Sequence, residues 1–450
     1  MLDLIVRGGT VVTPEGAQRL DLGVEGGQIV ALEAELSAPA RQEQDVSGLH
    51  LLPGLVDMHV HFNEPGRAHW EGLRSGSAAL VAGGGTVFAD MPLNSDPPLL
   101  DRPRFQAKLE AARRESLADF ALWGGLTPDN LAELPELAGC GVIGFKAFMS
   151  GSGIEEFRAA DEQTLHDGMQ VAARLGLPVA VHAESDELTA RLSAGLNRPG
   201  AGWRDYLNSR PVQAELEAIE QALRLAQETG CALHVVHVSS GAGVALIAEA
   251  RAQGVDVTAE TCPHYLAFTD TDLERLGAVL KCAPPLRDAA TRETLWQALL
   301  SGAVDTIGSD HSPSSPDLKD RDNPFAIWGG IAGVQSTLPV LLTEGYARRG
   351  LPLPQLSALL STTPARRFRL ARKGTLAVGQ DADLVAVDLG AVWTLEAAQL
   401  QQRWPQTSPY LGQRFSGQPR ATWRRGQLIW DGQQTVGHAG GQLLTPGPVS

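Results

Sequence analysis

The sequence predicts an α/β protein: a (β/α)8 barrel of the TIM type over residues 53–373, with a small β-sandwich domain built from both chain ends, 1–52 and 374–450. Two observations predict this class. The middle of the chain alternates apolar strand segments with helical ones, as a parallel barrel does. Both ends instead carry short strand segments separated by glycine. The 450 residues fit a large barrel with an extra module, or two to three separate domains.

The two ends of the chain have the same sequence pattern of short strand segments separated by glycine. Short strand segments come first in LDLIVRGGTVVTPEG, DLGVEGG and QIVALEA, and they return after Gly374 in TLAVGQDADLVAVDLG, RATWRRG and QLIWDG. Two similar ends around a different middle predict one sheet domain made from both termini. The segment from Gly437 is rich in Gly and Pro, and we expect it to be poorly ordered.

The middle of the chain holds eight apolar strand candidates. They are LLPGLVDMHV, GGTVFADMP, DFALWGGL, GVIGFKAFM, LPVAVHAES, CALHVVHVSS, GVDVTAETCP and GAVDTIGSDH. Stretches such as DEQTLHDGMQVAARLG lie between most of them, and their apolar residues recur near a period of 3.6, which indicates helices. In such a barrel the functional residues lie at the carboxyl ends of the strands.

Composition and charge indicate the cellular compartment of the protein and the classes of molecule that it can bind. The 43% apolar and 20% charged residues are typical of a soluble globular protein. A formal net charge of −15 disfavours nucleic acid and anionic membranes as partners. No apolar run is long enough to span a membrane, and MLDLIVRGGT is too quickly polar for a secretory signal. The four cysteines form no CxxC pair, so we expect reduced thiols and a cytoplasmic protein.

Polar residues gather at the predicted strand ends. His59 and His61 lie two apart on a strand, so both side chains point to the same face. Such a pair alone is weak evidence, because most histidines of this kind are only hydrogen-bonded. Four further strand ends carry Lys146, His182, His237 and Asp310. Their convergence predicts an imidazole and carboxylate pocket suited to Zn²⁺ or a similar divalent ion.

Lys146 needs its own explanation, because an ammonium among metal cations would be repelled. A desolvated lysine has a lowered pKa, and its neutral amine can capture CO₂ as a carbamate. The resulting carboxylate on a long stem could bridge two metal ions. The alternative is a lysine paired with a nearby aspartate, which leaves a two-metal site short of ligands.

With these residues the chain resembles the cyclic amidohydrolase branch of the amidohydrolase superfamily, and within that branch it resembles the allantoinases. The quoted resemblance covers nearly the whole chain and is carried by DMHVHFNEPGRAHWEG, FADMPLNS, GFKAFMSGSGIEEF, VHAE, VVHVSS, TCPHYL, KCAPPLR, TIGSDHSP and AIWGGIAGVQ. It implies the hydrolytic ring opening of allantoin to allantoate, a small-molecule substrate and a homotetramer.

The resemblance also implies a ligand set and a mechanism. His59, His61 and Asp310 would hold one divalent ion, and His182 with His237 the other. Lys146 would bridge them as N6-carboxylysine, with zinc as the expected metal and cobalt, manganese or iron as alternatives. A metal-activated hydroxide would attack the cyclic amide carbon, with Asp310 as general base and then acid. His311 would support the site without binding metal.

Two departures from relatives bear on the substrate. Dihydroorotases typically carry Arg where this chain has Asn63, and a neutral amide suits an uncharged ring. Hydantoinases and dihydropyrimidinases carry a Tyr shortly after the lysine, where this chain has a Gly-rich loop, 150–157, in which Ser150 or loop amides could stabilise the oxyanion. The expected substrate contacts are Asn63, Asn94, Ser150, Ala283, Ser312 and Gly329. For Asn94 and Ser312, turn and capping roles are the alternatives.

Two other functions stay open on the sequence. One is a hydantoinase, dihydropyrimidinase or dihydroorotase-like enzyme with broader scope for cyclic amides. The other is a non-catalytic relative that keeps the fold as a scaffold. Scaffold relatives lose metal ligands, whereas all six ligand positions are filled here.

Overall fold

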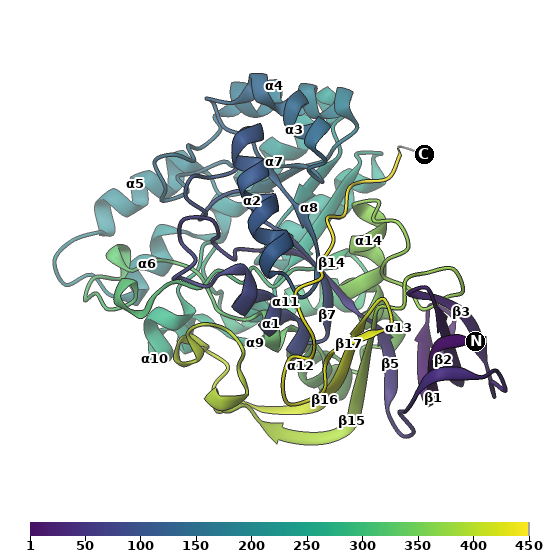
Figure 1. Cartoon of the computed structure of the whole chain (residues 1–450). Helices are drawn as coiled ribbons and strands as arrows, with labels where there is room; N and C mark the ends of the chain where they lie inside the picture. The colour runs from purple at the N-terminus through teal and green to yellow at the C-terminus, as the bar shows by residue number, and fades with distance from the viewer. Residues whose placement is uncertain (449–450) are drawn as a thin grey trace.

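The computed structural model describes residues 1–448 (Figure 1). Strands from both chain ends form one hydrogen-bonded sheet of eight strands in the order β17-β16-β15-β5-β1-β2-β3, with β4 pairing β1. Their bounds are β1 Leu2–Thr13, β2 Gly16–Glu25, β3 Gln28–Glu33, β4 Ala40–Asp45, β5 His50–Pro53, β15 Leu384–Thr394, β16 Arg414–Arg424 and β17 Gln427–Trp430. The antiparallel pairing of β5 with β15 joins the strands of the first fifty residues to those after Gly374, and both groups lie in the lower part of Figure 1.

The middle of the chain forms two parallel sheets, β6-β7-β8 and β9-β10-β11-β12-β13-β14. Their bounds are β6 Leu55–Val60, β7 Gly85–Asp90, β8 Asp119–Leu122, β9 Gly124–Gly125, β10 Phe145–Phe148, β11 Val179–His182, β12 Leu233–Val235, β13 Val257–Thr261 and β14 Thr306–Ile307. Only Trp123 separates β8 from β9. All eight predicted strand segments contain a strand, so the predicted α/β class is confirmed.

Helices connect the parallel strands. They are α1 Leu73–Ala82, α2 Arg102–Glu115, α3 Leu134–Cys140, α4 Glu162–Leu175, α5 Asp186–Leu196, α6 Trp203–Ser209, α7 Val212–Thr229, α8 Gly241–Ala252, α9 Pro263–Ala267, α10 Asp270–Leu276, α11 Ala289–Leu300, α12 Thr337–Val340, α13 Leu353–Ser357 and α14 Thr363–Arg367. α4 shows why such segments are helical. The Asp161 carboxylate caps it by accepting from Thr164 N at 2.8 Å, and Leu165, Met169 and Ala172 form its buried stripe.

Shorter helical turns complete the chain. The 3₁₀ turns are η1 Leu131–Glu133, η2 Gly277–Leu280, η3 Pro316–Leu318, η4 Pro324–Ala326, η5 Val334–Ser336, η8 Ala397–Gln399 and η9 Pro405–Thr407, and the π-helical segments are η6 Leu341–Ala347 and η7 Ala358–Thr362. Within residues 1–448, no helix has the length and apolar character that a membrane crossing requires.

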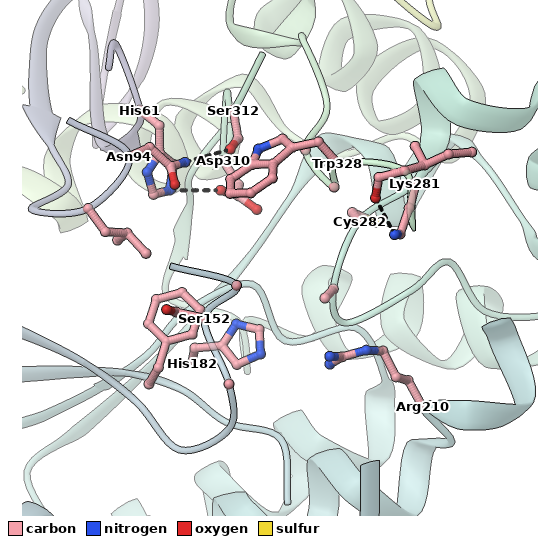
Figure 2. A pocket seen from close by; sticks show the side chains of 18 of the residues that line it. His61, Asn94, Ser152, His182, Arg210, Lys281, Cys282, Asp310, Ser312 and Trp328 are labelled. Atoms are coloured by element: carbon pink, nitrogen blue, oxygen red, sulfur yellow. Dashed lines mark hydrogen bonds and ion pairs between the residues drawn. The ribbon is translucent and has the colours of Figure 1, made fainter. Parts of the chain in front are cut away.

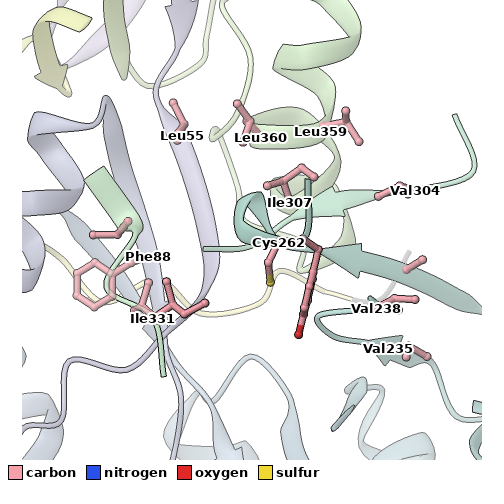
Figure 3. Close-up of a cluster of buried hydrophobic side chains, with 14 of the residues drawn as sticks. Leu55, Phe88, Val235, Val238, Cys262, Val304, Ile307, Ile331, Leu359 and Leu360 are labelled. Atoms are coloured by element: carbon pink, nitrogen blue, oxygen red, sulfur yellow. The ribbon is translucent and has the colours of Figure 1, made fainter. Parts of the chain in front are cut away.

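The parallel strands are buried on both faces, which leaves polar residues room mainly at their ends. Figure 3 shows part of this core, where Leu55 of β6 and Ile307 of β14 lie near Leu360 of the later π-helical segment. Cys262 lies in the same cluster, and all four cysteines are free thiols. Cys231, Cys262 and Cys282 are buried and serve as small packing residues, whereas Cys140 is partly exposed.

A buried ion cluster joins the eight-stranded sheet to the parallel strands. The Lys373 ammonium donates to Asp119 at 2.7 Å and to Asp383 at 2.8 Å, and it lies 2.9 Å from Asp381. Asp119 begins β8, whereas Asp381 and Asp383 directly precede β15. Arg425, after β16, also pairs with Asp119. The cluster thus links the start of β8 to the segments beside β15 and β16 through buried ion pairs.

Replacing Lys373 with Met is expected to lower the free energy of unfolding by about 3–5 kcal/mol, because buried carboxylates lose their shared cation. A urea titration followed by circular dichroism measures this change. The matched control is Arg158→Met, which removes an exposed ion pair with Asp129 and should change the free energy far less. Equal losses in the two variants would contradict the structural importance of the cluster.

The segment after Gly437 corrects one expectation from the sequence. Phe120 N donates to Gln442 O at 2.9 Å and Leu444 N donates to Phe120 O at 2.7 Å, so the segment lies along β8 as an extended chain. A Cβ at Gly441 would lie 2.0 Å from Ala118 O, so glycine permits this close approach. The prediction of poor order was wrong for these residues, because glycine here serves packing.

Candidate metal centre and substrate cavity

Three of the predicted ligands form one cluster. The side-chain donor atoms of His59, His61 and Asp310 all lie within 4.8 Å of one another. Asp310 Oδ1 is 3.3 Å from His59 Nε2 and 3.4 Å from His61 Nε2. His59 belongs to β6, His61 directly follows it, and Asp310 follows β14. Two imidazoles and a carboxylate in this arrangement fit a divalent metal ion.

The other two histidines lie beside this cluster. His182 ends β11 and His237 follows β12, and their Nδ1 and Nε2 atoms respectively lie 3.1 Å apart. The His237 ring centre is 5.4 Å from that of His59. Burial lowers the pKa of His59, His182 and His237, which keeps these imidazoles neutral and able to bind metal.

Lys146 of β10 is fully buried, and its ammonium has no hydrogen-bond partner among residues 1–448. No carboxylate of the described chain lies within ion-pair distance of it. Burial lowers the pKa of Lys146 to about 7, so a large share of the amine is neutral near that pH. A buried polar atom without a hydrogen-bond partner costs free energy, and the protein's own described residues do not satisfy this amine.

Two buried glutamates, which the sequence analysis did not single out, orient the histidines. Glu260 of β13 bonds His59 Nδ1 at 2.8 Å, and Glu184 bonds His182 Nε2 at 2.8 Å. Burial opposes the ionisation of Glu260, but His59 and His234 outweigh it and hold its pKa at about 2. Carboxylates that fix ring orientation in this way are typical partners of metal-binding histidines. The Glu inside the predicted strand segment VTAET could have indicated Glu260.

Asp57 and His311 hold the backbone around the cluster. Asp57 Oδ1 accepts from His59 N and from Ser309 N, both at 3.1 Å, which joins β6 to the segment after β14. His311 Nδ1 accepts from Gly333 N at 3.1 Å, and its carbonyl accepts from His61 N at 2.8 Å. Both residues therefore hold the backbone around the site, and this position of His311 fits the supporting role that the resemblance implies.

Unusual backbone conformations concentrate at this site. Four of the seven non-glycine residues with positive φ in the described chain belong to it: Asn63 at 65°, Asn94 at 68°, His237 at 41° and Asp310 at 43°. Such conformations cost free energy and persist where the surrounding structure enforces them. Here they turn the chain sharply after the strands that end in the metal-ligand candidates.

A cavity of about 410 Å³ opens next to the cluster. Its lining includes the predicted contacts Asn94, Ala283, Ser312 and Gly329, and the Asn94 amide donates to Ser312 Oγ at 3.4 Å (Figure 2). It also includes residues that the sequence analysis did not identify: Phe148, Ser152, Tyr206, Arg210, Lys281 and Trp328. Phe148 stacks on the His182 ring at 4.5 Å.

Two predicted contacts do not line the cavity. Asn63 is buried, and its amide donates to Pro313 O at 3.1 Å. Ser150 is also buried, and the loop presents Gly151, Ser152 and Gly153 to the cavity instead. The expectation of direct contact through Asn63 and Ser150 is corrected accordingly, because both side chains are buried and neither lines the cavity.

The comparisons with known proteins agree with this geometry. Residues 50–429 match the amidohydrolase family, and the chain belongs to that family. It is 58% identical over 446 residues to an allantoinase of Deinococcus radiodurans, and the match covers 99% of each chain. It is 54% identical to an allantoinase of Solibacter usitatus, and this match covers 99% of this chain and 97% of the relative. An L-hydantoinase (dihydropyrimidinase) from Arthrobacter aurescens has a similar solved structure, with a TM-score of 0.95, 35% identity and coverage of 99% and 100%.

Replacing Glu260 with Gln is expected to lower metal affinity or kcat about 10- to 100-fold, because a neutral amide orients the His59 ring less firmly. Metal content after dialysis against buffered zinc and the rate of ring opening measure the two effects. Glu162→Gln, at an exposed pair with Arg224, is the control. Unchanged metal affinity and kcat in the Glu260 variant would show that this carboxylate does not orient a ligand.

Proposed function

We propose that this protein hydrolyses allantoin to allantoate. A ring C–N bond breaks, the hydroxyl of water adds to the carbonyl carbon, and a proton goes to the departing ring nitrogen. The main observation in support of this function is the cluster of His59, His61 and Asp310 beside a cavity of small-molecule size. Allantoinases match this chain over nearly their full length.

We propose that two divalent ions, expected to be zinc, bind here. His59, His61 and Asp310 would hold one ion, and His182 with His237 the other. Lys146 would bridge the two as N6-carboxylysine, formed from its neutral amine and CO₂. The buried, unpartnered Lys146 amine supports this assignment. When bound, the ions would polarise the scissile carbonyl and lower the pKa of water.

Asp310 has the position of the proton carrier. It is the only carboxylate among the described residues that line the cavity. Burial disfavours its charged form, but His59, His61 and His237 hold the pKa of Asp310 below its usual range, so it starts as a base. Its carboxylate would take a proton from the attacking water and return it to the departing ring nitrogen.

Substrate recognition would use the cavity wall. The Asn94 amide, the Ser312 hydroxyl and the backbone at Ala283 and Gly329 offer donors and acceptors to a neutral ring. The loop lines the cavity through Gly151, Ser152 and Gly153, and the Ser152 hydroxyl donates to Phe157 O at 2.6 Å. Asn63 would act indirectly, by holding the chain at Pro313.

Several broader features belong to the same proposal. The parallel strands would form one closed eight-stranded barrel over 53–373, with β8 and β9 as one strand position. The bridge between Val60 and His311 supports closure. Residues 1–52 and 374–450 would form the β-sandwich domain, of which 449–450 lie outside the described residues. The free cysteines favour a reducing, cytoplasmic setting, and the family resemblance favours a homotetramer.

The test compares turnover of allantoin, hydantoin, dihydrouracil and dihydroorotate by the metal-loaded enzyme. Allantoin should give the highest kcat/KM. Hydantoin opening is the second candidate, favoured by the similarity to the solved hydantoinase structure. Faster opening of hydantoin than of allantoin would overturn the substrate assignment, and no turnover of any of these cyclic amides would favour the scaffold alternative.

A further inference from the structure

Two lysines, the buried Lys281 and the partly exposed Lys319, hold the segment 325–330, which forms one wall of the cavity. Lys319 Nζ donates to Trp328 O at 2.9 Å and to Gly330 O at 2.7 Å. Lys281 Nζ donates to Ile327 O and, at 3.5 Å, to Phe325 O. The two ammonium groups therefore anchor the same wall through its backbone carbonyls.

The two lysines differ in what they face. Lys281 lines the cavity, whereas Lys319 is absent from the lining. Neither has a carboxylate within ion-pair distance among residues 1–448. Burial lowers the pKa of both to about 7. Lys281 is thus a buried donor group at the cavity surface without an opposing charge from the protein.

The surroundings of Lys281 make this donor distinctive. Arg210 also lines the cavity, but Glu184 neutralises its charge. The Lys281 ammonium lies 4.9 Å from the ring centre of Tyr206. In Figure 2, Lys281 lies beyond Trp328 as seen from His61 and Asp310, away from the metal-ligand candidates. A substrate ring held at those residues would direct its substituent, and not its reacting amide, toward this lysine.

We propose that Lys281 is a specificity-determining residue that donates a hydrogen bond to the carbonyl oxygen of a polar substituent on the substrate ring. This proposal rests on the proposed function, and the ureido arm of allantoin supplies such an oxygen. A neutral carbonyl acceptor needs no additional charge from the protein. An apolar arm would cover the ammonium without replacing its lost hydration, so the same lysine disfavours alkyl-substituted rings.

The experiment compares wild type with Lys281→Met on three substrates: allantoin, unsubstituted hydantoin and 5-isobutylhydantoin, whose arm is apolar. Met keeps an unbranched side chain, one atom shorter than that of Lys, and removes the donor. We expect the ratio of kcat/KM for allantoin to that for hydantoin to fall about tenfold or more. The kcat/KM for 5-isobutylhydantoin should rise above the wild-type value.

Lys319→Met is the matched control, because it releases the same wall segment without changing the cavity lining. It should lower kcat/KM for allantoin and hydantoin alike, leaving their ratio within about threefold of wild type. Lys281→Gln, which keeps a shorter donor, should restore part of the allantoin preference and serves if the Met variant does not fold.

The outcomes separate the proposals. Equal shifts of the ratio in the Lys281 and Lys319 variants would mean that Lys281 only holds the wall, which overturns the inference. An unchanged ratio in Lys281→Met, with wild type active on allantoin, would also overturn it while leaving the proposed function standing. A metal-loaded wild type that does not open allantoin would overturn both.

Discussion

Replacing Asp310 with Asn is expected to lower kcat for allantoin opening by about 10²- to 10⁴-fold, the usual contribution of a positioned acid or base. The amide keeps the shape of the side chain but cannot accept a proton from water or return one to the ring nitrogen. The rate is measured at saturating zinc and saturating allantoin, so that weaker metal binding does not limit it.

The controls for this prediction separate proton transfer from general damage. Asp129→Asn changes an exposed carboxylate far from the lining of the cavity and should leave kcat unchanged. Metal content by elemental analysis shows whether Asp310→Asn still binds its ions. A metal-saturated Asp310→Asn enzyme with kcat within about threefold of wild type would show that another group carries the proton.

Replacing Lys146 with Ala is expected to lower kcat about 10³-fold or more and to reduce the bound metal below two ions per chain. The carbamate would be the only ligand shared by both ions, and its loss removes much of the charge stabilisation at the reacting carbonyl. Acetate, which supplies a small free carboxylate, should restore part of the activity because truncation leaves space beside the ligand histidines.

A direct measurement tests the modification itself. Wild type exchanged into ¹³C-labelled bicarbonate should show a carbamate carbon signal by NMR, and Lys146→Ala should not. Lys146→Arg keeps a cation but cannot form the carbamate under these conditions, so it should be as inactive as the Ala variant. Two tightly bound ions in Lys146→Ala would rule out the carbamate bridge.

The strand positions were predictable because of how parallel strands are buried. Each strand is covered on both faces, so its sequence is largely apolar, and polar residues such as His182 and Asp310 stand out near its end. The same contrast revealed Lys146. The metal-ligand candidates could therefore be found before their geometry was known.

Other residues of the site could not be predicted from a polar residue at the end of an apolar strand. Glu260 acts through His59, which lies on β6 far away in the sequence, so only the folded structure shows this pair. Glu184 lies two residues after His182, and only the folded structure shows that its carboxylate turns back onto that ring. Asn63 and Ser150 lie in polar loops whose positive φ angles and turns decide which side chain faces the cavity. Lys281 and Lys319 come together only because the segment 325–330 folds back between them.

The pairing of β5 with β15 has a consequence for the synthesis of the protein. Leu51 and Ala386 are partners in the sheet although they lie more than 300 residues apart. At a translation rate of about 5–20 residues per second, the ribosome needs roughly 15–70 s to supply the second strand after the first. Until then β5 presents unpaired N–H and C=O groups to any strand nearby. The nascent chain therefore depends on chaperones or on low local concentration to keep this open edge from pairing with a neighbouring nascent chain.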